Sequence, residues 1–167
     1  MTFDIDGLLF DIPSDWRAAK YDDWAFYRKR FIRTREKTKA ADLIAIDPAR
    51  TLWFIEGKDY RKYQRTKPSE LHEEIAGKVL DTLAALLPAA VNGDDFDEKV
   101  LARHALRAER LRVVLHLEQP RKHSKLFPRA IDPADVQQRL RKLIKPVDPH
   151  PQVVEMAKMG SLAWSVR

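Results

Sequence analysis

Three charged residues stand inside two apolar stretches of the chain: Asp42 in KAADLIAID (39–47), and Glu56 and Lys58 in TLWFIEGKD (51–59). An ionised group among apolar side chains is costly unless it is paired or bound to a metal. Two carboxylates held close together are ligands for a hard divalent cation, and an ammonium beside them can orient a water molecule or neutralise charge on a phosphate. These residue types therefore predict a metal-assisted site that acts on phosphodiester bonds.

The positions of these charges predict a β-hairpin with the two carboxylates on one face. Side chains alternate along a strand, so Glu56 and Lys58 share one face of the second strand. If Asp47 pairs with Thr51 across a three-residue loop, Asp42 lies opposite Glu56. A two-residue loop would instead send the two carboxylates to opposite sides of the sheet. The prediction of a shared site thus depends on the register of the hairpin.

The pattern of Asp42, thirteen residues and then Glu56-Gly57-Lys58 resembles the motif of the PD-(D/E)xK superfamily, the restriction-endonuclease-like phosphodiesterases. The resemblance covers roughly residues 24–87, with 111–118 as a possible further core strand. It implies that Asp42 and Glu56 bind Mg²⁺ or Mn²⁺ and that the Gly57 carbonyl is a further ligand. It also implies that Lys58 is the catalytic lysine, acting with Asp42 and Glu56.

The sequence departs from the family pattern ahead of the hairpin. Ala41 stands where the motif has proline, and no helix with an upstream glutamate precedes Asp42. Asp23, with its neighbour Asp22, is the candidate for a third acid and metal ligand, and Glu36 is another. Without the resemblance, the charged residues of the hairpin also have a plainer reading, as structural ion pairs.

In that plainer reading the charges are structural. Asp42 and Lys58 form a cross-strand salt bridge on an exposed face, and Glu56 pairs with Arg50 or Lys39.

Basic residues are concentrated around the hairpin. The net charge is +6, and the segment from Trp16 to Lys67 holds 15 lysines and arginines against 7 acids. Aromatic residues are interleaved there, namely Trp16, Tyr21, Trp24, Tyr27, Tyr60 and Tyr63. Because basic groups offset phosphate charge and aromatic faces stack on bases, we expect a nucleic acid partner, with DNA as the expected form. The candidate contacts are Arg28, Arg30, Arg61, Lys62 and Arg65. The alternative is a solvated basic surface over an aromatic core, and the basic stretch PRKHSK (120–125) has the same two readings.

Local patterns predict the order of the elements. Strands are expected at 7–13, 23–32, 39–47, 51–59 and 111–118, although 23–32 could also form a helix. Helices are expected at 69–87, with Ser69 as N-cap and Pro88 as its end, at 97–110, and after the cap Asp132. A tail divided at Gly160 follows. The order predicts an α/β or α+β fold, a restriction-endonuclease-like mixed sheet flanked by helices, as a single domain over 1–167.

Composition excludes some classes and sets the remaining expectations. The chain has no cysteine, its first residues are acidic, and no apolar run approaches the ~20 residues of a membrane span. We therefore expect a soluble cytoplasmic protein without a membrane partner. The leading hypothesis is a Mg²⁺-dependent nuclease that cleaves DNA. The alternative is a catalytically inactive module on the same fold that binds nucleic acid or protein, and the sequence leaves open whether the chain forms a homodimer or acts with a partner protein.

Overall fold

A computed structural model describes residues 1–120 and 131–167, so residues 121–125 of the basic stretch PRKHSK lie outside the described residues. Within these ranges the chain forms two β-sheets and four α-helices. The larger sheet has the strand order β3 (Arg17–Lys20), β4 (Leu43–Ile46), β5 (Thr51–Asp59), β6 (Arg110–Glu118) and β7 (Gln152–Val154). The smaller sheet contains β1 (Thr2–Ile5), β2 (Leu8–Asp11) and β8 (Ser165–Val166). The α-helices are α1 (Ala25–Lys29), α2 (Leu71–Asn92), α3 (Phe96–Ala105) and α4 (Pro133–Ile144), and the short 3₁₀ turns are η1 (Tyr21–Asp23) and η2 (Phe31–Arg33).

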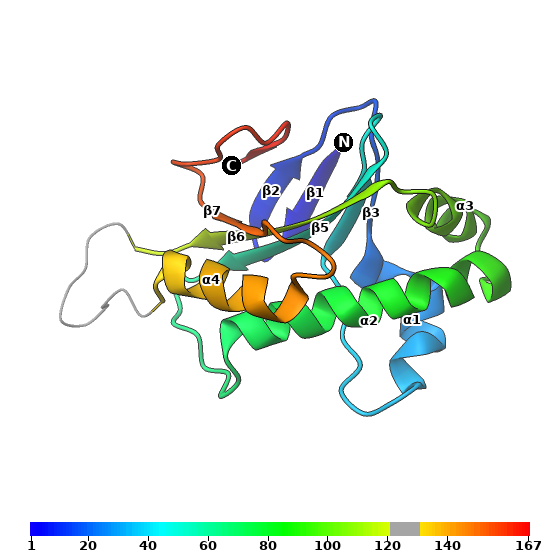
Figure 1. Cartoon of the computed structure of the whole chain (residues 1–167), viewed down its shortest axis with the longest axis horizontal. Helices are drawn as coiled ribbons and strands as arrows, with labels where there is room; N and C mark the ends of the chain where they lie inside the picture. Colours follow the sequence, from blue (N-terminus) through cyan, green and yellow to red (C-terminus); the bar gives the residue numbers. More distant parts are fainter. Residues whose placement is uncertain (121–130) are drawn as a thin grey trace.

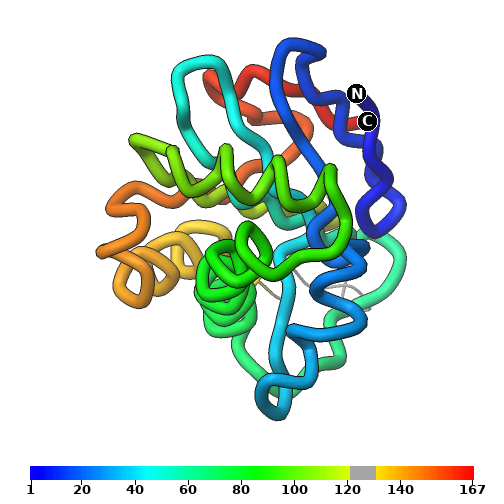
Figure 2. Tube along the Cα trace, turned by 90° about the vertical axis from the view of Figure 1, so that its right-hand side faces the viewer, coloured from blue at the N-terminus to red at the C-terminus, as the bar shows by residue number. Residues whose placement is uncertain are grey.

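The larger sheet is covered on both faces. The long helix α2 runs across one face with α3 and α4 packed against it, and the N-terminal strands lie on the other side of the sheet (Figure 1). Figure 2 looks along α2 and shows α4 next to it. In the larger sheet β3, β4 and β5 are antiparallel neighbours, whereas β5, β6 and β7 are parallel. The predicted mixed sheet with flanking helices is therefore confirmed.

The hairpin of β4 and β5 has the register that brings the two carboxylates together. Ile46 pairs with Leu52, and the Asp47 N–H donates to the Thr51 carbonyl at 3.1 Å. The loop of three residues is closed by Arg50, whose φ of 59° lies in the left-handed region. Continuing the register past the pair of Leu43 and Ile55 places Asp42 opposite Glu56.

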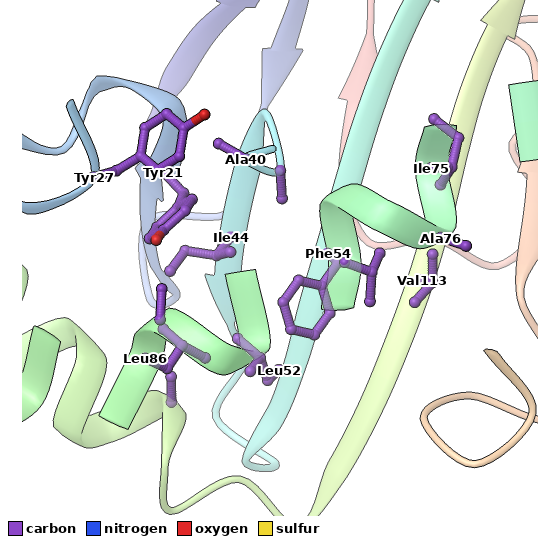
Figure 3. Packing of buried hydrophobic residues seen from close by; sticks show 14 of the residues in the cluster. Tyr21, Tyr27, Ala40, Ile44, Leu52, Phe54, Ile75, Ala76, Leu86 and Val113 are labelled. Atoms are coloured by element: carbon purple, nitrogen blue, oxygen red, sulfur yellow. The ribbon is translucent and has the colours of Figure 1, made fainter. Parts of the chain in front are cut away.

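The two faces of β5 belong to two apolar clusters. Leu52 and Phe54 face α2, where they pack with Ile75 and Leu86 (Figure 3). Ile55 faces the smaller sheet. Each fully buried large side chain of this kind stabilises the fold by about 1.5–3 kcal/mol. Strand β5 is thus buried on both faces, so its charged end is held on a rigid support.

Gly57 permits the two sheets to approach closely. A Cβ atom at this position would lie 2.9 Å from Ile5 Cγ2 and 3.2 Å from Phe10 Cε2. Both of these side chains come from the smaller sheet. The glycine between Glu56 and Lys58 therefore has a packing role that the sequence motif did not indicate.

The prediction of a strand at 23–32 is wrong, and the alternative prediction of a helix there is confirmed. This region forms η1, α1 and η2. The carboxylate of Glu98 accepts the first N–H groups of α1, from Ala25 at 2.6 Å and from Phe26 at 3.0 Å. N–H donors at the start of a helix need acceptors and favour a negative charge, so the Glu98 carboxylate of α3 stabilises α1. The local sequence alone did not decide between a strand and a helix here.

Both predicted ends of α2 also need correction. Glu70 occupies the N-cap position, while the Ser69 hydroxyl lies 3.3 Å from Arg65 Nη2. At the other end α2 continues through Pro88 to Asn92. Pro88 removes one backbone hydrogen bond, but Ala89 and Ala90 beyond it are buried in the core, and this packing carries the helix past the proline.

The remaining elements follow their patterns more closely. The strand expected at 111–118 is β6, and the Asp132 carboxylate accepts the Ala134 N–H at the start of α4. The helix expected at 97–110 is α3, which ends earlier, at Ala105. The tail forms two short strands separated by a turn with Gly160 at φ 63°. Within residues 1–120 and 131–167 no helix has the length and apolar character needed to cross a bilayer.

Candidate functional site

The structure brings Asp42, Glu56 and Lys58 together and adds a lysine from α2. The Lys78 ammonium lies 2.5 Å from Asp42 Oδ1 and 2.7 Å from Glu56 Oε2. Lys58 Nζ lies farther away, 3.6 Å from Asp42 Oδ2 and 4.0 Å from Glu56 Oε2. The four side chains form one buried cluster of two carboxyl groups and two ammonium groups, which we call the charged cluster.

Backbone hydrogen bonds fix both carboxyl groups. The Asp42 N–H donates to Glu56 Oε1 at 3.0 Å, and the Gly57 N–H donates to Asp42 Oδ2 at 3.1 Å. Each strand thus donates a backbone hydrogen bond to the acidic side chain of the other strand, just beyond the last residue pair of the β4–β5 hairpin. Groups held in this way keep their positions when a ligand binds, which lowers the cost of binding.

Burial and mutual charge set the protonation of the cluster. Burial raises the pKa of Glu56 to about 8, and the neighbouring Asp42 adds to the shift. Burial alone would also raise the pKa of Asp42, but the ammonium groups of Lys78 and Lys58 hold it below its ordinary value. The pKa of Lys78 is raised, because the two acids outweigh its burial. The cluster is neutral when both acids are ionised and carries one positive charge when Glu56 is protonated, so it does not repel an anion.

The plainer reading of the charges is partly correct. Asp42 and Lys58 do form an ion pair between strands, but both side chains are largely buried. Glu56 is fully buried and pairs with Lys78 instead of Arg50 or Lys39. Arg50 forms an ion pair with Glu109 at the other end of the hairpin.

The residues of the cluster fit a divalent cation in part. Asp42 and Glu56 converge on one positive centre, as carboxylates around a hard metal do. The Lys78 ammonium fills that position, however, and among the described residues no third acidic or imidazole side chain completes a group of metal ligands. Lys78 therefore occupies the position that a cation bound by both acids would take.

The acidic residues predicted as a third metal ligand, Asp23, Asp22 and Glu36, lie outside the charged cluster. Asp23 pairs with Arg28 at 2.6 Å and with Lys20 at 3.7 Å. Its neighbour Asp22 faces the cavity beside Asp42, and its Oδ1 is buried without a hydrogen-bond partner among the described residues. Burial raises the pKa of Asp22, with Lys20 acting against it. Glu36 is exposed.

Most of the predicted nucleic-acid contacts are engaged within the protein. Arg61 pairs with Asp59, Arg65 with Glu74, and Arg30 with Asp94. Arg28 pairs with Asp23, and Lys62 is exposed. Composition identified a basic region, but side chains already paired with carboxylates contribute less to binding phosphate.

A cavity of 570 Å³ opens at the charged cluster. It lies between the loop that precedes β4 and the loop that joins β5 to α2, and both loops extend to the lower side of the molecule in Figures 1 and 2. Its charged lining residues are Lys37, Lys39, Lys67 and Lys78, with Asp22, Asp42 and Glu74. Lysines therefore outnumber acids around the opening.

Sequence reasoning missed Lys78, although one signal was present. Lys78 is the sole lysine or arginine in the helix predicted at 69–87. It lies between Ile75 and Val79, which face the core, so its side chain starts at the edge of the buried face of α2. A lone cation at that edge, in the helix that follows Glu56 and Lys58, was a candidate partner for the two acids.

The chain has a detectable similarity to one kind of characterised protein. It is 33% identical over 159 residues to a cysteine--tRNA ligase of Neisseria meningitidis serogroup A / serotype 4A (strain DSM 15465 / Z2491), across 77% of this chain. The chain spans 23% of the length of that ligase. No family model matches the chain. No solved structure matches it either.

This similarity corrects the predicted function. The related protein is named as a tRNA ligase and not as a nuclease, and this finding overturns the prediction of a nuclease that cleaves DNA. The correction concerns the function and does not change the contacts within the charged cluster.

Proposed function

We propose that this chain is an RNA-binding domain and that tRNA, or RNA resembling part of tRNA, is its ligand. The observation that carries the proposal is the lysine-lined cavity at the charged cluster. Four lysines line its walls: Lys67 and Lys78 are paired with carboxylates, whereas Lys37 and Lys39 have no ion pair among the described residues. Phosphate groups are the anions that RNA offers at regular spacing. The named substrate of the related ligase makes tRNA the first RNA to test.

The charges around the cavity suit a polyanion. Lys37 is exposed and Lys39 is half-buried. Lys78 holds the inner end of the cavity, where it is 14% exposed. Lys37 and Lys39 can attract the RNA backbone, and Lys78 offsets Asp42 and Glu56 so that the base of the cavity does not repel a phosphate.

The proposal is limited to RNA binding. Because the chain spans 23% of the related ligase, aminoacylation is not part of it. Nucleic acid as the partner class follows from the same reasoning, and RNA replaces DNA as the expected form.

The binding of a metal ion and the resemblance to the PD-(D/E)xK superfamily are also proposals. The register that places Asp42 opposite Glu56 supports a scaffold like that of the PD-(D/E)xK superfamily, without its cleavage activity. We propose that Mg²⁺ or Mn²⁺ can bind Asp42 and Glu56 when Lys78 withdraws, and the cation would then supply positive charge beside a bound phosphate.

The test is a binding titration with labelled tRNA and with duplex DNA. The double variant Lys37→Glu/Lys39→Glu should bind tRNA at least about tenfold more weakly, because two attractions become repulsions. The matched control Lys142→Glu/Lys158→Glu makes the same change of charge at exposed positions that do not line the cavity. Equal binding by the cavity variant and the wild type would contradict the proposed site, and preference for duplex DNA would contradict the proposed ligand.

A further inference from the structure

One aromatic side chain of the basic region stands apart from the others. Tyr63 is 80% exposed, whereas Trp16, Tyr21, Trp24 and Tyr27 are buried. Tyr60 is half-buried against the core. A single exposed aromatic residue is common on protein surfaces, so its exposure carries no weight until its surroundings are considered.

Tyr63 lies in a loop that is anchored on both sides. Before it, Arg61 pairs with Asp59 at 2.6 Å. After it, Arg65 pairs with Glu74 at 2.7 Å, and Arg65 Nη2 donates to the Ser69 carbonyl at 2.8 Å.

A third contact holds the end of the same loop. Lys67 also pairs with Glu74, at 2.7 Å. Ion pairs to a buried carboxylate of α2 reduce the conformational freedom of the loop. Less entropy is then lost when a ligand binds to a side chain that this loop presents.

The same loop forms a wall of the lysine-lined cavity. Lys67, Pro68 and Ser69 line the cavity, opposite Lys37 and Lys39 of the loop before β4. Tyr63 precedes Lys67 by four residues, so their Cα atoms lie at most about 14 Å apart. The exposed lysine Lys62 is its direct neighbour. An exposed ring thus lies within reach of the backbone of a strand whose phosphates occupy the cavity.

We propose that Tyr63 is a stacking platform for an unpaired base and that the RNA bound at the cavity is single-stranded there. This inference rests on the proposed function. An aromatic face next to cationic groups binds a base by stacking while the cations bind its phosphates. A base in a duplex has both faces covered by its neighbours, so it does not offer a face to Tyr63. The tyrosine therefore selects an unpaired end, loop or linker of RNA over a helical stem.

The test compares a short unstructured RNA with an RNA duplex, each titrated against three variants. Tyr63→Ala should weaken binding of the unstructured RNA by about five- to hundredfold, the range for one base stacked on an aromatic ring, and should leave duplex binding unchanged. Tyr63→Phe should restore most of the affinity, because the ring is kept and the hydroxyl lost. Phe96→Ala is the matched control, since Phe96 is 75% exposed at the start of α3 and does not line the cavity.

The outcomes separate this inference from the proposed function. Wild-type binding of the unstructured RNA with no loss in Tyr63→Ala would overturn the stacking role and leave RNA binding intact. An equal loss for both RNAs would overturn the selectivity for unpaired bases. Failure of the wild type to bind either RNA would instead contradict the proposed function itself.

Discussion

The Lys78 ammonium lies 2.5 Å from Asp42 Oδ1, so helix α2 supplies a cation to an acid at the end of the central hairpin. The same ammonium contacts Glu56, which is fully buried. The protein therefore carries an internal positive charge at the point where two carboxylates converge. Together with Lys58, it balances the two carboxylates when both are ionised and leaves the cluster compatible with phosphate.

Removal of the internal cation should be costly. Lys78→Met keeps much of the length of the side chain but leaves the two acids with the more distant Lys58 as the remaining cation of the cluster. The variant should be less stable by about 3 kcal/mol, as for other buried pairs that lose one partner, measured by urea unfolding. The control Lys142→Met at an exposed position of α4 should change the stability by less than about 0.5 kcal/mol.

The same variant should respond to divalent cations. With Lys78 absent, Mn²⁺ can approach Asp42 and Glu56, so millimolar Mn²⁺ should raise the melting temperature of Lys78→Met by more than it raises that of the wild type. An equal response of the two proteins would show that Lys78 does not compete with a metal ion.

Two glycine substitutions should have opposite effects on stability. Gly57→Ala introduces a Cβ atom 2.9 Å from Ile5 Cγ2 in the tightly packed contact between the two sheets, and it should destabilise the protein by about 1–3 kcal/mol. Gly77→Ala lies within α2, where the Cβ atom would meet the flexible Lys39 side chain at 3.4 Å, and it should stabilise by about 0.5–1 kcal/mol. Denaturant unfolding of both variants provides the measurement, and a neutral Gly57→Ala would contradict the close approach of the sheets.

The hairpin and its acids were predictable because their determinants are local. Alternation and the short turn define which residues face each other, and the register of Asp42 and Glu56 follows from the loop length. Helix α1 was not predictable in the same way. Its first N–H groups bind Glu98, which lies more than 70 residues away in the sequence, so the decision between strand and helix depends on tertiary structure.

Composition also could not predict which charged side chains are paired in the folded protein. Arg61 and Arg65 look available in the sequence, but each is bound to a carboxylate in the folded chain. Lys37 and Lys39 were not selected, yet they line the cavity. Sequence shows how many cations a region has, while the fold decides which of them remain available to a ligand.

The ion pairs of Glu74 predict a dependence of stability on pH. Burial would raise the pKa of Glu74, but Lys67 and Arg65 lower it to about 2, below its ordinary value of 4.5. A lowered pKa contributes stability that is present above about pH 4.5 and is lost as the pH falls toward 2. Glu74→Gln should therefore be less stable than the wild type by about 1–2 kcal/mol near pH 7, after screening of the pairs by solvent, and the gap should narrow below pH 4.5. Urea unfolding at several pH values measures it, and a gap that does not vary with pH would contradict the ionic role.

RNA binding should show a salt dependence that reports the cavity lysines. For single strands, the logarithm of the binding constant falls with the logarithm of salt concentration by about 0.7 for each phosphate neutralised. Lys37→Glu/Lys39→Glu should therefore reduce the magnitude of the slope by about 1.4. The exposed control Lys142→Glu/Lys158→Glu should keep the wild-type slope. Equal slopes for the cavity variant and the wild type would mean that these lysines do not contact phosphate.

Hydrogen exchange of the protein with and without saturating tRNA tests RNA binding at the cavity most directly. Protection should appear in residues 35–40, in the loop 60–70 and in the first turns of α2, because these segments surround the cavity. Strands β1 and β2, on the far side of the sheet, should exchange at the same rate in both samples. Protection confined to segments away from the cavity, or none at all at saturating tRNA, would contradict RNA binding at this site.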